Sequence, residues 1–184
     1  MVREALRIAY APAAYYRPWQ AVYAGATVDQ QRWLNTALLR QQRLPMPASL
    51  QAPDDPLARR LIGLWPLLPQ VATLMGAARL RDWVPAQRGC AALPATVQAF
   101  MRAGYGDDRP VMLPAMPAAS LADTLLRWGG AELQPLGLVL PAWLSTRLCL
   151  PFLPMRAENE CPPDSGHVDM DLFWNAVTYA EKLS

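Results

Sequence analysis

The chain has 184 residues, of which 53% are hydrophobic and 17% are charged. This length fits one domain, or one domain with a small appendage, and the hydrophobic content is ample for a core. The charged share is below the usual value of about 25%, so some apolar surface is expected to stay exposed or to contact a partner. The net charge is only +2 and the arginines are scattered. Both facts argue against a nucleic-acid partner, because phosphate binding needs a concentrated basic patch.

The opening, residues 1–26, is rich in aromatic residues and proline. Pro12 lacks a backbone N–H and biases Ala11 toward an extended conformation. The segment is therefore predicted to form an irregular strap over other elements and not to begin a long helix. Its aromatic side chains would each bury an apolar ring and leave the polar tip in water.

The next segment predicts a helix that begins at Thr27 or Asp29 and runs to about Arg43. Truncating Trp33 or Leu38 to alanine is expected to open a core cavity, at a cost of about 2–5 kcal/mol. Residues 46–55, with their prolines and aspartates, are predicted to be a linker. The helical spacing places four residues on one buried face: Leu34, Ala37, Leu38 and Gln41.

Nineteen prolines divide the chain into short helical pieces. Asp55 is expected to cap a helix that begins at Pro56, where the missing N–H costs nothing. Pro66 and Pro69 should bend or restart the chain. The apolar period then continues to about Trp83.

Proline, glycine and capping residues also mark the ends of further helices. Pro94 opens one helix, and Gly104 is well placed as the left-handed residue after its end. Ser120 should cap another helix that runs to Trp128, which the pair Gly129-Gly130 is expected to end.

The last part of the chain predicts a short helix over residues 141–150, with a buried strand as the alternative, and a polar loop over residues 156–168. A final helix should begin at Asp169 or Asp171 and reach Leu183. Period-two alternation of β-branched residues is scarce throughout. The prediction is therefore an all-α protein: a single compact domain over residues 1–184, built from short proline-bounded helices.

The cysteines and apolar segments favour the cytoplasm. Cys90, Cys149 and Cys161 cannot all pair within one chain, and none forms a Cys-x-x-Cys motif, so reduced thiols are expected. The first residues lack the apolar stretch of about 7–15 residues that a secretory signal needs. Residues 133–154 are the main membrane candidate, but prolines and Arg147 interrupt them. No direct membrane insertion is predicted.

Catalysis is difficult to build around one histidine. His167 lies among Asp164, Ser165, Asp169 and Asp171, so a divalent metal or a Ser-His-Asp arrangement is conceivable. The simpler interpretation is a hydrated loop in which Asp169 or Asp171 caps the last helix, since a rigid site is better built on scaffold elements. No catalytic residue, metal or cofactor is therefore predicted.

Aromatic and apolar faces are the remaining candidates for function, since tryptophan is enriched at binding hot spots. Three tryptophans lie on the apolar faces of predicted helices and are therefore expected in the core: Trp65, Trp128 and Trp174. Three residues at the strap or at a helix end are the candidates for protein binding: Tyr15, Trp19 and Trp83.

Three short blocks carry a family resemblance. Leu6 to Tyr15 forms a Pro-Ala-x-Tyr-like strap, Trp33 to Leu39 contains Leu-Asn-x-Ala-Leu-Leu, and Trp143 to Pro151 contains an Arg-Leu-x-Leu stretch. In this order they resemble the SctK family, the accessory subunit of the cytoplasmic sorting platform of bacterial type III secretion systems. The chain departs from that pattern in its heavier proline content and in the polar insertion before the last helix.

The resemblance implies a non-enzymatic, cytoplasmic helical adaptor at the cytosolic face of the inner membrane. Its implied partners are the cytosolic domain of the inner-membrane ring protein SctD and the pod protein SctQ. Two alternatives remain open. One is an export chaperone or regulator of the same secretion pathway, and the other is a metal-dependent hydrolase centred on His167.

Overall fold

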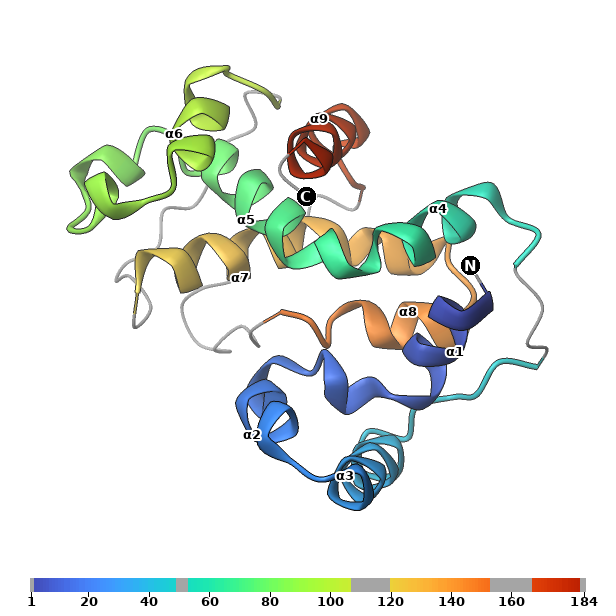
Figure 1. Cartoon of the computed structure of the whole chain (residues 1–184). Helices are drawn as coiled ribbons and strands as arrows, with labels where there is room; N and C mark the ends of the chain where they lie inside the picture. The colour runs from blue at the N-terminus through green and yellow to red at the C-terminus, as the bar shows by residue number, and fades with distance from the viewer. Residues whose placement is uncertain (1, 49–52, 107–119, 153–166, 183–184) are drawn as a thin grey trace. The chain divides into compact units, whose positions relative to one another are not determined.

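The computed structural model describes residues 2–48, 53–106, 120–152 and 167–182 (Figure 1). These residues form helices and turns, with no β-strand among them, so the all-α prediction is confirmed. They gather into two units. Unit 1 comprises residues 1–66 and 136–152, and unit 2 comprises residues 67–135 and 153–184. The expectation of one domain over the whole chain remains a prediction.

Unit 1 is built from short helices joined by tight turns. Its 3-10 turns are Pro12–Ala14 and Arg17–Trp19. Its α-helices are α1 (Val2–Tyr10), α2 (Gln20–Gly25), α3 (Val28–Gln41), α4 (Pro56–Leu64) and α8 (Ala142–Leu148).

The predicted irregular strap is wrong at its start, because α1 is a regular helix of nine residues. Its buried positions Ala5, Ile8 and Ala9 follow the i, i+3, i+4 spacing of an amphipathic helix. Pro12 biases the residue before it away from the helical region, and Ala11 has φ −120°. The residues before Ala11 are not restricted in this way, so the helix can continue up to Tyr10.

The predicted helix starts in unit 1 are confirmed. Thr27 caps α3 in a capping box: its hydroxyl accepts from the Gln30 amide at 3.4 Å, and the Gln30 side chain accepts from the Thr27 amide at 2.8 Å. The Asp55 carboxylate accepts from the Ala58 amide at 2.8 Å and caps α4. Of the predicted linker, residues 46–48 and 53–55 are not helical, and residues 49–52 lie outside the described part.

Unit 2 contains helices of eight to thirteen residues, and their starts also follow the prediction. Pro69 lies in the first turn of α5, and Gly104 follows α6 with φ +70°. The Ser120 hydroxyl and the Asp169 carboxylate cap the last two helices. The helices are α5 (Leu68–Arg79), α6 (Ala95–Arg102), α7 (Leu121–Leu133) and α9 (Met170–Glu181).

Gly129 and Gly130 do not end α7, which continues to Leu133. Figure 1 shows α7 crossing α5 closely. A Cβ atom at Gly129 would overlap the backbone carbonyl of Ala72, and one at Gly76 would overlap the carbonyl of Leu125. The glycines therefore allow two helix backbones to approach, a function that a Gly-Gly pair in a sequence does not reveal.

Two of the three tryptophans that were expected in the core are buried, namely Trp65 and Trp128. Trp174 on α9 is 36% exposed, so its placement in the core is wrong. It follows Phe173, which takes the buried position of the helix. Of the predicted polar loop, only residues 167 and 168 belong to the described part, and they lead into α9.

The helical stretch Pro56–Arg79 is long and apolar enough to cross a membrane, by length and composition only. Its most apolar part is 67% buried inside the protein, as in a core helix, so this is weak evidence for a span. The segment 133–154, the membrane candidate of the sequence, contains the last residue of α7, the 3-10 helix Gln134–Leu138 and α8 where it is described.

Candidate protein-interaction surface

The end of α1 has two backbone carbonyls that the helix itself cannot satisfy. The carbonyl of Ile8 would normally accept from the residue four positions later, but that residue is Pro12, which has no N–H. The carbonyl of Ala9 would accept from Ala13, but the Ala13 amide donates instead to Asn35 Oδ1 at 3.0 Å. Buried carbonyls of this kind need another donor.

Arg147 on α8 supplies these donors from a fully buried position. Its Nε donates to the Ile8 carbonyl at 3.1 Å and its Nη2 to the Ala9 carbonyl at 2.9 Å. Its Nη1 donates to the carbonyls of Pro45 and Trp143, each at 2.7 Å. One side chain thus joins α1, the end of the α3 segment and α8.

The buried guanidinium of Arg147 is surrounded by dipoles. Its partners in the described part of the chain are backbone carbonyls and, at 3.7 Å, the sulfur of Met46. Burial lowers the pKa of Arg147. The charge is favoured by the negative end of the α1 dipole, where the last carbonyls converge.

Tyr15 belongs to the same polar centre. Its hydroxyl donates to the Ile8 carbonyl at 2.6 Å, and its ring meets Trp65 edge-on with centroids 5.4 Å apart. Burial raises the pKa of Tyr15 above its ordinary value. The side chain is only 9% exposed, so the structure leaves little of this predicted binding residue for a partner.

Polar side chains hold α3 against the opening segment. Gln31 Nε2 donates to the carbonyls of Tyr23 and Ala26, both at 3.2 Å. Asn35 accepts from Ala13 on its oxygen, and its nitrogen lies 3.5 Å from the Tyr23 hydroxyl. Together with the buried Leu38, these residues follow the i, i+4, i+7 spacing of one helix face.

The inward face of α3 is therefore rotated relative to the predicted one. Leu38 is buried as expected, but Gln41 is exposed and Leu34 and Ala37 are only half-buried. The apolar pattern did not reveal that Gln31 and Asn35 would bond to backbone groups of α2 and the 3-10 turn.

Trp33 points away from this inward face. It lies about 200° around the helix from Gln31, at about 100° per residue, and it is 68% exposed. The expected core cavity at Trp33 is therefore wrong.

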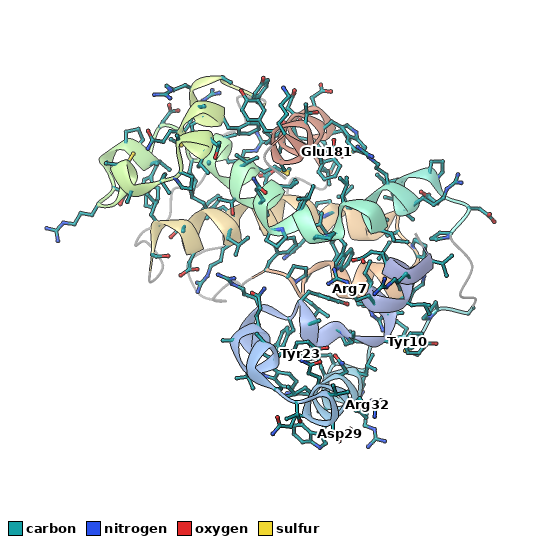
Figure 2. The ribbon with its side chains drawn as sticks, viewed as in Figure 1. Arg7, Tyr10, Tyr23, Asp29, Arg32 and Glu181 are labelled. Carbon is teal, nitrogen blue, oxygen red and sulfur yellow. The ribbon has the colours of Figure 1, made fainter. Side chains whose placement is uncertain are left out.

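Figure 2 shows Asp29 and Arg32 on the same helix; their side chains form an exposed ion pair at 3.3 Å. We define the Trp33 face as five exposed residues: Asp29, Arg32, Trp33, Thr36 and Arg40.

Unit 2 exposes a smaller aromatic surface on α9. Met170 and Trp174 are each 36% exposed and stand four residues apart, so they lie on one side of the helix. This pair is separate in sequence from the Trp33 face and belongs to the other unit.

The two remaining predicted binding residues are half-buried. Trp19 in unit 1 packs edge-on against Tyr16, with centroids 5.4 Å apart. Trp83 in unit 2 lies in the turn after α5, where its amide donates to the Leu80 carbonyl at 2.9 Å. Their role in partner binding remains a prediction.

An ion-paired arginine organises the part of unit 2 near His167. Arg79 Nε lies 3.2 Å from Glu132 Oε2, and Arg79 Nη2 lies 3.1 Å from Asp169 Oδ2. The other oxygen of Asp169 caps α9 by accepting from Leu172 at 2.9 Å, as predicted. The described residues contain no group of three His, Cys, Asp or Glu side chains that could hold a metal ion. His167 itself is exposed.

The described geometry is that of a helical protein with braced helices and exposed aromatic side chains suited to contacts with other proteins. The chain belongs to the OrgA/MxiK family of bacterial type III secretion apparatus proteins, whose family model matches residues 5–182. A comparison with curated proteins gave no match, and neither did one with solved structures. The family resemblance noted in the sequence, to the SctK proteins, is thereby confirmed.

Proposed function

We propose that this chain is a cytoplasmic adaptor of the type III secretion sorting platform. It would join the cytosolic domain of the ring protein SctD to the pod protein SctQ at the cytosolic face of the inner membrane. Membership of a secretion apparatus family supports the setting. One structural observation carries the proposal: each unit exposes a tryptophan on a helix, Trp33 on α3 and Trp174 on α9.

The charges of the two units support two different partners. Unit 1 contains nine arginines and four acidic residues, and unit 2 contains eight basic and eleven acidic residues. Subtracting the acidic from the basic residues gives a net charge of +5 for unit 1 and −3 for unit 2. Because complementary charge selects partners, these units favour binding to different proteins.

The bracing of α3 also supports an adaptor. The bonds from Gln31 and Asn35 fix this helix before any partner arrives. A surface that is already ordered loses less entropy on binding. In this proposal the protein acts through binding alone, without a substrate or a cofactor.

Co-purification tests the proposed function. The chain is produced with the SctD cytosolic domain and with SctQ from the same host, singly and together. We expect two binary complexes and one ternary complex, with Trp33→Ala and Trp174→Ala weakening different binary complexes. A stable pair with an exported substrate, and none with SctD or SctQ, would support the chaperone alternative instead.

A further inference from the structure

We propose that the Trp33 face of α3, extended by Arg43, binds an acidic segment of a protein partner that carries an apolar residue. The proposal names the chemistry of one partner contact and rests on the proposed function for its setting. Its evidence is the exposure of Trp33 and the arrangement of arginines around it.

Trp33 and Arg40 lie on the same side of α3. They stand seven positions apart, which is close to two helical turns, so both side chains extend from one face. Thr36 lies between them and is exposed. A partner lying along this face would meet an aromatic ring and then a guanidinium.

Positive charge on this face is not neutralised within the described part of the chain. Asp29 is the acidic residue of α3, and it is already paired with Arg32. Arg40 and Arg43 are both exposed, and no ion pair joins either to a described residue. Carboxylates from a partner would therefore meet two available guanidinium groups, which bind them in bidentate geometry.

Arg43 occupies a position that normally suits glycine. The Leu44 amide donates to the Leu39 carbonyl at 3.0 Å, and the Arg43 amide donates to the Arg40 carbonyl at 3.2 Å. This is the Schellman pattern at a helix end, and its left-handed residue is Arg43, with φ +48°. Glycine would adopt this conformation without strain. An arginine held there keeps a cation directly after the end of α3 at a conformational cost, which favours a binding role.

The same face suits a protein better than a lipid surface. Membrane-surface helices need a broad apolar side, but here one tryptophan stands among charged and polar residues. Tryptophan and arginine are the residue types most enriched at the energetic centres of protein interfaces.

Photo-crosslinking in the secreting host tests the proposal. A benzophenone amino acid replaces Thr36 in the full chain, and a second strain carries it at the exposed Arg59 of α4 as a control. We expect the Thr36 probe to join a peptide of another protein in which Asp and Glu exceed Lys and Arg. The crosslinked peptide is identified by mass spectrometry.

Charge variants then test the arginines. Arg40→Gln with Arg43→Gly should lower the crosslink yield about tenfold, as expected for loss of two charge-assisted contacts. Since Arg43→Gly relieves the helix-end strain, a loss of yield cannot be assigned to unfolding. The matched control, Arg3→Gln with Arg59→Gln, removes two exposed charges from other helices and should leave the yield unchanged.

Other outcomes overturn the proposal. These are a crosslink to a second copy of this chain, to lipid or to a non-acidic segment, no crosslink, or a yield that the Arg40/Arg43 variant does not reduce. Co-sedimentation with phosphatidylglycerol vesicles that depends on Trp33 would also contradict it. If the acidic segment belongs to neither SctD nor SctQ, the binding surface stands and the proposed function is wrong. If both complexes form without a Thr36 crosslink, only the binding surface is wrong.

Discussion

Each unit is organised around one buried arginine, but the two arginines have different partners. Arg147 in unit 1 donates to four backbone carbonyls, whereas Arg79 in unit 2 is paired with the carboxylates of Glu132 and Asp169. The helices around them differ as well. Unit 1 joins pieces of three to fourteen residues, and unit 2 packs two helices of twelve and thirteen residues backbone against backbone.

The comparison shows what short helices need. An isolated helix of fewer than about 12 residues is marginal in water and leaves unsatisfied groups at both ends. In unit 1 the planar side chain of Arg147 has several donors, which satisfy the end of α1 and also bond to Pro45 and to Trp143 of α8. In unit 2 the glycines bring α5 and α7 together, and the ion pairs of Arg79 add α9. We therefore expect unit 1 to depend most on a polar side chain and unit 2 on close packing.

Arg147→Ala should have the largest effect. It removes the donor of the Ala9 and Pro45 carbonyls, leaves the Ile8 carbonyl with only the Tyr15 hydroxyl, and opens a cavity. We therefore expect a loss of about 3–5 kcal/mol in the free energy of unfolding. Urea unfolding measures the loss, and hydrogen exchange should show reduced protection in α1. Arg102→Ala, at an exposed position on α6, is the control and should change stability by less than about 0.5 kcal/mol. Equal stability of the Arg147 variant and the parent would contradict this role.

Gly129→Ala tests the backbone contact in unit 2. The added methyl group would overlap the Ala72 carbonyl, so α5 and α7 must separate, at a cost of about 1–3 kcal/mol. Gly63→Ala is a matched control, because nothing lies within 4 Å of a Cβ at this position of α4. There the better helix propensity of alanine should stabilise the protein by about 0.5–1 kcal/mol. Thermal melting of both variants measures the difference, and two equal melting temperatures would rule out the close contact.

Asp169→Asn isolates the ion pair in unit 2. Asparagine caps a helix as well as aspartate does, so α9 should keep its start while Arg79 loses one carboxylate. We expect a loss of about 1–2 kcal/mol, since Glu132 still faces the guanidinium. The effect should persist at high salt because the pair is buried. A loss that disappears at about 1 M salt would show that the pair is accessible to solvent.

Tyr15→Phe tests the polar centre of unit 1 through the pH dependence of the free energy of unfolding. At neutral pH it removes one hydrogen bond to Ile8 and should cost about 1 kcal/mol. Burial raises the pKa of Tyr15, so its contribution is complete below the ordinary tyrosine pKa of about 10 and declines above it, as the unfolded chain releases the proton first. The stability gap between the parent and Tyr15→Phe should narrow above about pH 10. A gap that stays constant in urea titrations on both sides of that pH would contradict a buried Tyr15.

The sequence predicted where helices begin better than which way they face. Caps at Thr27, Asp55, Ser120 and Asp169 are local features, because the side chain and the amide that it caps lie three positions apart. Proline marked the other boundaries for the same reason. The irregular strap failed because a proline ends a helix without preventing one before it.

The orientation of α3 and the continuation of α7 depend on distant residues. Asn35 faces inward because it bonds to Ala13, 22 residues away, and Gly129 lies inside a helix because Ala72 passes beside it. Arg147 bonds to residues 138 and 139 positions earlier. These residues lie too far apart in the sequence for a hydrophobic period to reveal that they pair. The lone arginine in an apolar, proline-rich segment was the available signal, and it marked a buried structural residue.

Trp33→Ala should have the smallest effect on stability and a large one on binding. Since the side chain is 68% exposed on α3, its removal should change the free energy of unfolding by less than about 0.5 kcal/mol. Leu38→Ala, on the same helix but fully buried, should cost about 2–5 kcal/mol. Both variants are measured by urea unfolding and by secretion from the host. Leu38→Ala should lower secretion together with the amount of folded protein, whereas Trp33→Ala should lower secretion at an unchanged amount. If the Trp33→Ala strain secretes like the parent, the exposed tryptophan on α3 has no binding role. The proposed difference in function between the two faces of this helix is then wrong.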